Sequence, residues 1–199
     1  MKRDDLRAFL AEKPYDAMVL TSEISRRYAT GFHSTAGAVY LSAKQAVFFT
    51  DFRYVEAARA AVSDFEVREI KVGQSYSALI NELIDTDGAK KIALEDKTLT
   101  YAEFMSWSTA LHGTAVRLED GVESLRIMKE DTEVEKIVAA QRIAEQALEE
   151  VLNDIKVGVT EKELAARLTY LMLHHGAENM SFDPIVVSGA NSSKPHGVP

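Results

Sequence analysis

Apolar residues in the first 125 positions switch repeatedly between helical and extended spacing. Leu6, Phe9 and Leu10 share one helical face, Pro14 ends that pattern, and the apolar run 17–20 then predicts a buried strand. Similar runs predict strands at 38–41, 46–49, 65–67, 92–94 and 115–118, and helices at 54–62, 76–84 and 101–111. This alternation favours an α/β domain in which helices pack on a mixed sheet. The runs 38–41 and 46–49 are separated by residues 42–45, which predicts an antiparallel hairpin.

The pattern changes after Leu125. Thr132 with Glu135 predicts a capping box, followed by apolar positions spaced three and four apart up to Ile155, as in a long amphipathic helix. Thr160 with Glu163 predicts a second box and a second helix, which Gly176 ends. A boundary near residues 119–131 therefore divides the chain into domains 1–125 and 126–199.

The last segment consists of a short extended stretch and a loop. Residues 181–188 predict a strand with Pro184 near its start, and residues 189–199 are rich in Gly, Ser, Asn and Pro, which is typical of a loop. Because domains rarely end inside such a loop, we expect the second domain to be incomplete in this chain.

Composition narrows the class of protein. The net charge of −8 argues against binding nucleic acid, which needs clustered Lys and Arg. The N-terminus lacks the apolar region of a signal peptide, and no run reaches the length of a membrane span. The absence of cysteine fits a reducing compartment, so the prediction is a soluble cytoplasmic protein.

Histidines are the main candidates for chemistry. His196 follows Pro195, which fixes the backbone, and Asn191 and Ser192 can bond to nearby backbone, so the loop could hold an imidazole suited to proton transfer near neutrality. The group around His174 and His175 is read as structural, because adjacent helical residues point about 100° apart. Templates for serine hydrolases, nucleotide binding and zincins are absent from the sequence.

Three motifs of the second domain together resemble a known family. Residues 126–137, the turn 155–161 and the segment from Ser181 to His196 resemble, in order, the domain entry, a turn and the first active-site strand and loop of prolidases and Xaa-Pro aminopeptidases. Residues 28–32 and 50–54 resemble motifs of the creatinase-like N-terminal domain. The resemblance therefore spans nearly the whole chain.

The resemblance implies both fold and activity. It implies a creatinase-like N-terminal domain, a mixed sheet of ribonuclease-H-like type with helices, followed by the first part of an α+β pita-bread domain. The family's metallopeptidases form homodimers and cleave the bond before proline in Xaa-Pro peptides, using two divalent metal ions such as Mn, Co or Zn.

The same resemblance assigns roles to three residues. It places His196 at the family histidine that contacts substrate and helps to stabilise the tetrahedral intermediate. It places Phe182 at a position that lines the substrate pocket. His33 matches a loop from which some relatives send a side chain into the partner's active site.

The metal ligands are where this sequence departs from the family. The family's two Asp, one His and two Glu lie beyond the Pro-His loop, so no residue of this chain is predicted to bind metal. We therefore expect an N-terminal portion of a longer peptidase, inactive by itself and without a cofactor of its own.

Two other functions stay open at this stage. Creatinase-type hydrolases use the same fold and histidine without metals, so His196 alone does not separate them from peptidases. Other pita-bread relatives are non-catalytic binding or dimerisation modules.

Overall fold

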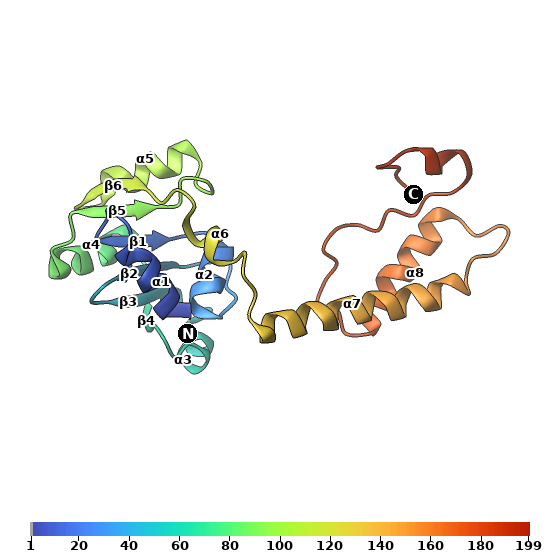
Figure 1. Ribbon diagram of the computed structural model, residues 1–199, viewed down its shortest axis with the longest axis horizontal. Coiled ribbons are helices and arrows are strands. Elements are labelled where there is room, and N and C mark those ends of the chain that lie inside the picture. Colours follow the sequence, from blue (N-terminus) through green and yellow to red (C-terminus); the bar gives the residue numbers. More distant parts are fainter. Residues whose placement is uncertain (1) are drawn as a thin grey trace. The chain divides into compact units, whose positions relative to one another are not determined.

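The computed structural model describes residues 2–199, which form two units (Figure 1). The first ends at Met128 and the second runs from Lys129 to Pro199. The first unit contains six strands, β1 (Ala17–Leu20), β2 (Ala38–Ser42), β3 (Ala46–Thr50), β4 (Glu66–Glu69), β5 (Lys91–Leu94) and β6 (Thr114–Arg117). They form one mixed sheet in the order β4-β3-β2-β1-β5-β6, in which β1, β2 and β3 run antiparallel and the outer pairings are parallel. The predicted α/β fold is confirmed.

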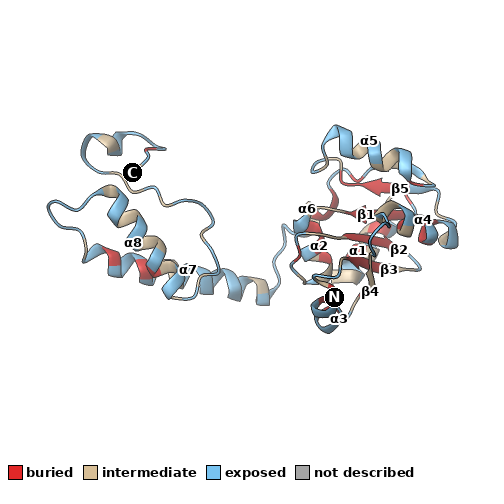
Figure 2. Cartoon of the chain, turned by 180° about the vertical axis from the view of Figure 1, so that it is seen from behind, coloured by how far each residue is buried: buried red, intermediate tan, exposed pale blue. Residues whose placement is uncertain are grey.

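Helices cover both faces of this sheet (Figure 1). The helices of the first unit are α1 (Lys2–Ala11), α2 (Glu23–Thr30), α3 (Val55–Ala61), α4 (Tyr76–Asp87), α5 (Tyr101–Ala110) and α6 (Gly121–Leu125). Because successive side chains of a strand point to opposite faces, Met18 and Leu20 enter one apolar cluster while Ala17 and Val19 enter another. Figure 2 shows the buried residues concentrated on these strands.

The predicted hairpin is confirmed as β2 and β3. Its turn is fixed by Ser42, whose Oγ accepts hydrogen bonds from the backbone N–H groups of Lys44 and Gln45 at 3.1 and 2.9 Å. Two helices, α2 and α6, were not predicted. In α2 the buried position 26 is an arginine, which interrupts the apolar spacing that reveals a helix.

The second unit pairs two long helices, α7 (Asp131–Leu152) and α8 (Glu161–His174), followed by irregular chain and a short 3₁₀ helix, η1 (Gly189–Ser193). The capping box predicted at Thr160 and Glu163 is confirmed. The box predicted at Thr132 and Glu135 is wrong. The capping pair is Glu130 and Glu133, because the helix already begins at Asp131 and leaves Thr132 inside its first turn.

The predicted strand at 181–188 is also wrong. This segment has no ladder partner among residues 2–199, and the six-stranded sheet belongs entirely to the first unit. A strand needs a neighbour to satisfy its backbone groups, so an extended sequence without one stays irregular.

Candidate functional site

The loop at residues 31–37 carries His33 and follows directly on α2. Gly31 ends the helix in the left-handed conformation, with φ of 69°, and its N–H donates to the carbonyl of Arg27 at 2.8 Å. The ring of Phe32 packs beside the rings of Phe48 and Tyr54, with centroids 6.3 and 6.4 Å apart. The loop is therefore anchored at its first residues.

Buried Arg26 holds the middle of this loop. The residue is only 4% exposed, and its guanidinium donates hydrogen bonds to the carbonyl oxygens of Thr21 and Ser34, the second at 2.7 Å. Burial lowers the pKa of this guanidinium from its ordinary value. A buried cation bonded to backbone carbonyls fixes the chain that supplies them.

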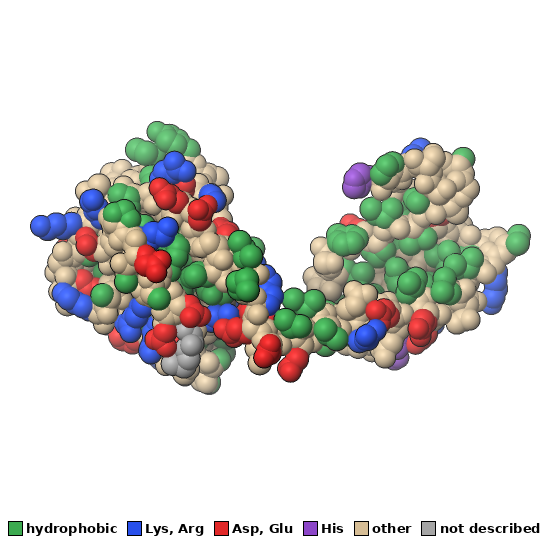
Figure 3. Space-filling view, in the orientation of Figure 1, with side chains coloured by type: hydrophobic (Ala, Val, Ile, Leu, Met, Phe, Trp, Pro, Cys, Tyr) green, Lys and Arg blue, Asp and Glu red, His purple; other side chains and the backbone are tan. Residues whose placement is uncertain are grey.

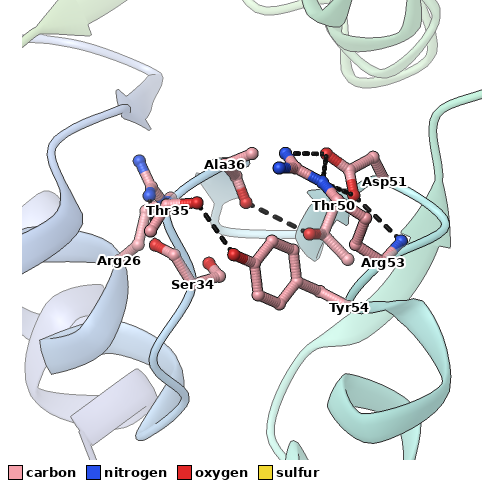
Figure 4. A network of polar contacts seen from close by, with 8 residues as sticks. All are labelled: Arg26, Ser34, Thr35, Ala36, Thr50, Asp51, Arg53 and Tyr54. Carbon is pink, nitrogen blue, oxygen red and sulfur yellow. Dashed lines mark hydrogen bonds and ion pairs between the residues drawn. The ribbon is translucent and has the colours of Figure 1, made fainter.

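The motif at residues 50–54 closes on the same loop (Figure 4). Thr50 Oγ1 donates to the carbonyl of Ala36 at 3.1 Å, and the hydroxyls of Thr35 and Tyr54 lie 2.8 Å apart. Arg53 lies against Asp51, with Nη2 2.7 Å from Oδ2. The motifs 28–32 and 50–54 therefore meet in space and together determine the path of residues 31–37.

His33 itself points to the surface of the first unit. Its side chain is half exposed, and Nε2 lies 2.7 Å from Oε1 of Glu23 on α2. The imidazole is thus accessible and has one carboxylate beside it.

The loop that carries His196 closes on itself in the second unit. Backbone N–H groups of Asn191, Lys194 and Gly197 each donate to the carbonyl three residues earlier, at 3.0 to 3.1 Å. Gly197 is buried, and a Cβ there would lie 2.8 Å from Cγ1 of Val187. His196 is exposed at the surface of this folded loop, and nothing in residues 2–199 hydrogen-bonds its ring.

Glu161, at the first position of α8, anchors this loop from outside. Its Oε1 accepts from the backbone N–H and the hydroxyl of Ser188, the hydroxyl at 2.9 Å, and its Oε2 accepts from Nδ2 of Asn191 at 2.9 Å. Hydrogen bonds from Asn191 and Ser188 lower the pKa of the Glu161 carboxyl. The anion is therefore the form that the loop binds.

The other predicted site residue, Phe182, lies in the irregular segment that precedes the loop. Its side chain is 72% exposed, so most of its apolar ring is accessible. His33 belongs to the first unit, whereas Phe182 and His196 belong to the second.

The remaining histidines of the second unit have local partners. His174 stacks on Tyr170 with centroids 5.6 Å apart, and His175 Nε2 lies 2.7 Å from Oε1 of Glu150. Among residues 2–199 no group of three His, Asp or Glu side chains is arranged to hold a metal ion. These described residues therefore do not fit a two-metal centre, which needs several convergent ligands.

An apolar groove of about 310 Å³ lies in the second unit. Figure 3 shows hydrophobic side chains gathered on this unit. The lining residues are Leu148, Val151, Leu152, Ile155, Leu164, Leu168, Ile185, Val186 and Val187.

Comparison with known proteins decides the family. The model of the Creatinase/Prolidase N-terminal domain matches residues 2–128, more than half of the chain. The chain belongs to this creatinase/prolidase family. Metallopeptidase family M24 matches residues 135–199, the part that contains most of α7, all of α8 and the His196 loop.

Relatives of this creatinase/prolidase chain match it from end to end. An Xaa-Pro dipeptidase from Bacillus anthracis superimposes with a TM-score of 0.90 at 38% identity, over 99% of this chain and 55% of that one. An X-Pro aminopeptidase from Thermotoga maritima gives 0.85 at 32% identity, over 99% and 55%. The uncharacterized peptidase YqhT of Bacillus subtilis is 36% identical over all of this chain and 56% of its own length.

This chain thus spans about half the length of the curated relatives it matches. Among its described residues, no helix has both the length and the apolar character needed to cross a bilayer.

Two residues of the site were missed from sequence. Arg26 lies in a helix that the pattern did not predict, and Glu161 was noted only as the last residue of the turn motif 155–161. The signal that could have found Glu161 is its place beside Thr160 and Glu163. Those two residues complete the helix cap and leave the Glu161 carboxylate without a local role.

Proposed function

We propose that this chain provides the N-terminal domain and the opening part of the catalytic domain of a metal-dependent Xaa-Pro exopeptidase. The observation that carries the proposal is the exposed imidazole of His196 on a hydrogen-bonded loop inside the M24-matched region. The relatives named Xaa-Pro dipeptidase and X-Pro aminopeptidase support this substrate class.

In this proposal His196 is the catalytic residue that contacts substrate. An exposed imidazole can donate a hydrogen bond to the oxygen of the peptide bond as negative charge develops there. Phe182, exposed in the preceding segment, lines the pocket and contacts apolar parts of the peptide.

The divalent metals of the proposed peptidase would be held by residues other than those described, since residues 2–199 do not supply a ligand group. Such ions would supply an activated water as nucleophile. The 199-residue chain by itself is therefore proposed to be inactive toward Xaa-Pro peptides.

His33 is proposed to act at the active site of a second copy in a homodimer. Its exposed ring on a loop anchored by Arg26 and the residues 50–54 supports this role. The cytoplasmic location predicted from composition stays a prediction.

The test compares this chain with the longest product of its gene. Both are incubated with Mn²⁺ and Ala-Pro, and released proline is measured. We expect proline release from the longer product, abolished by a chelator and reduced at least about 100-fold by H196A, and none from the 199-residue chain.

Three results would overturn parts of the proposal. Robust turnover by the 199-residue chain contradicts its inactivity. Hydrolysis of creatine that persists in chelator favours the creatinase-type alternative, and a longer product inactive toward both substrates favours a binding module. Ala-Pro-Ala in place of Ala-Pro separates an aminopeptidase from a dipeptidase.

A further inference from the structure

Both oxygens of the Glu161 carboxylate accept hydrogen bonds from the loop that carries His196. One oxygen binds the backbone N–H and hydroxyl of Ser188, and the other binds the side-chain amide of Asn191. These contacts join residues 27 and 30 positions apart in sequence. They are therefore tertiary contacts and not part of the helix.

The start of α8 does not need Glu161. Thr160 Oγ1 accepts from the backbone N–H of Glu163 at 3.2 Å, and the Glu163 carboxylate accepts from the backbone N–H of Thr160 at 2.8 Å. This reciprocal pair satisfies the backbone N–H groups of Thr160 and Glu163 without using Glu161. Two carboxylates of one helical turn thus bind different partners: Glu163 caps the helix, and Glu161 binds the His196 loop.

The hydrogen bonds of Glu161 and Asn191 reach the chain on both sides of His196. Ser188 precedes η1, whereas the Asn191 amide that binds Glu161 also lies 3.3 Å from the carbonyl oxygen of Val198, beyond the histidine. Glu161 and Asn191 together tie the two ends of segment 188–198, and the tight turn ending at Gly197 lies between them. The backbone that carries the imidazole is fixed from two directions.

We propose that Glu161 is a positioning residue, which holds the His196 loop so that the imidazole meets the substrate. This inference rests on the proposed function, in which His196 contacts the peptide. Glu161 acts through the loop and touches neither the imidazole nor the substrate. Hydrogen bonds to charged groups are stronger than neutral ones, so the anion is suited to hold three donors at once.

The first test uses the 199-residue chain and needs no activity. Ring resonances of ¹³C,¹⁵N-labelled histidine are recorded for the unmodified chain, E161Q and E163Q, with H196A for assignment. We expect the His196 resonance to shift and broaden in E161Q and to stay in place in E163Q, although E163Q removes a carboxylate from the same turn. An unchanged resonance in E161Q would overturn the proposal.

The second test uses the longest product of the gene in the Ala-Pro assay. E161Q is expected to lower kcat/KM by between about 10- and 100-fold, since displacing a reacting group by about 1 Å costs on that order, whereas E163Q keeps the unmodified rate. Combining E161Q with H196A should add no further loss, because both changes remove the same contribution.

The outcomes separate the two proposals. Full activity of H196A would show that the proposed function misassigns the imidazole, whatever Glu161 does. If H196A is inactive while E161Q is as active as E163Q, or if the E161Q and H196A losses multiply, the positioning role of Glu161 is wrong.

Discussion

The two units of this chain differ most in how their apolar residues are used. The first unit buries fifteen residues in one cluster and twelve in another, one on each face of its sheet, whereas the described core of the second unit consists of Ala147, Val151 and Leu171. Large apolar side chains such as Leu148, Leu152 and Ile155 are about half exposed in the second unit. Since burial of apolar area is the main favourable term in folding, the first unit is expected to be the more stable.

The two histidine loops differ in a parallel way. Residues 31–37 are held by buried Arg26, while the loop of His196 is held by Glu161 at the surface. Hydrogen bonds in a buried environment are stronger, and their loss leaves groups unsatisfied. The first loop is therefore tied to the core of its unit through Arg26, and the second depends on a few exposed contacts.

The largest effect is expected from truncating a large side chain in the core of the first unit. Phe48→Ala should lower the free energy of unfolding of that unit by about 3–5 kcal/mol, because it leaves a cavity under the sheet. The single tryptophan, Trp107, lies on α5 of the first unit, so its fluorescence in urea follows this unit alone.

The matched change in the second unit is Leu171→Ala. Leu171 lies on α8 and packs against Ala147 and Val151 of α7. We expect the substitution to abolish amide protection in both helices without moving the Trp107 transition. A Trp107 transition that shifts as far in L171A as in F48A would show that the units unfold together. The two units would then not differ in stability.

A smaller effect is expected from removing the buried cation of the first loop. Arg26→Ala leaves the carbonyls of Thr21 and Ser34 without their donor, which should cost about 2–3 kcal/mol in the Trp107 urea transition. Arg27→Ala, at the exposed neighbouring position, is the control and should change the transition by less than about 0.5 kcal/mol. Equal effects of the two substitutions would contradict the anchoring role of Arg26.

The smallest effect concerns pH. Burial alone would raise the pKa of the Asp87 carboxyl, but hydrogen bonds from three side chains of the hairpin outweigh it and lower the pKa. The donors are Tyr40 at 3.0 Å, Ser42 at 2.6 Å and Gln45 at 2.8 Å. A lowered pKa in the folded state means stability that is present above the ordinary value of 3.8 and is lost as the pH falls through the lowered pKa.

Acid titration of the Trp107 transition measures this contribution. Asp87→Asn should remove on the order of 1 kcal/mol of stability at pH 7 and flatten the loss below pH of about 4, because the amide cannot ionise. Glu82→Gln, on the exposed side of the same helix, should leave the profile unchanged. An unaltered acid profile in D87N would show that other carboxylates carry the effect.

Much of the fold could be predicted from sequence because its signals are local. The strand at 17–20 and the hairpin follow from short apolar runs, and the second capping box follows from two residues three positions apart. The first capping box was misplaced by two residues because Thr132 and Glu135 have the residue types and spacing of a box, although the helix already begins at Asp131. The segment 181–188 has the composition of a strand, but the prediction of a strand there was wrong. Strand pairing depends on a neighbouring strand, which no local pattern reveals.

The candidate site divides in the same way. Sequence alone determined that the chain alternates helices and strands, that His33 follows the motif at residues 28–32, and that His196 follows a Pro in a loop, because spacing and residue type carry that information. Only the tertiary structure decided that Arg26 is buried under residues 31–37 and that Glu161 holds Ser188 and Asn191. The physical reason is that hydrogen bonds between distant residues depend on how elements pack, and packing is a property of the whole folded chain.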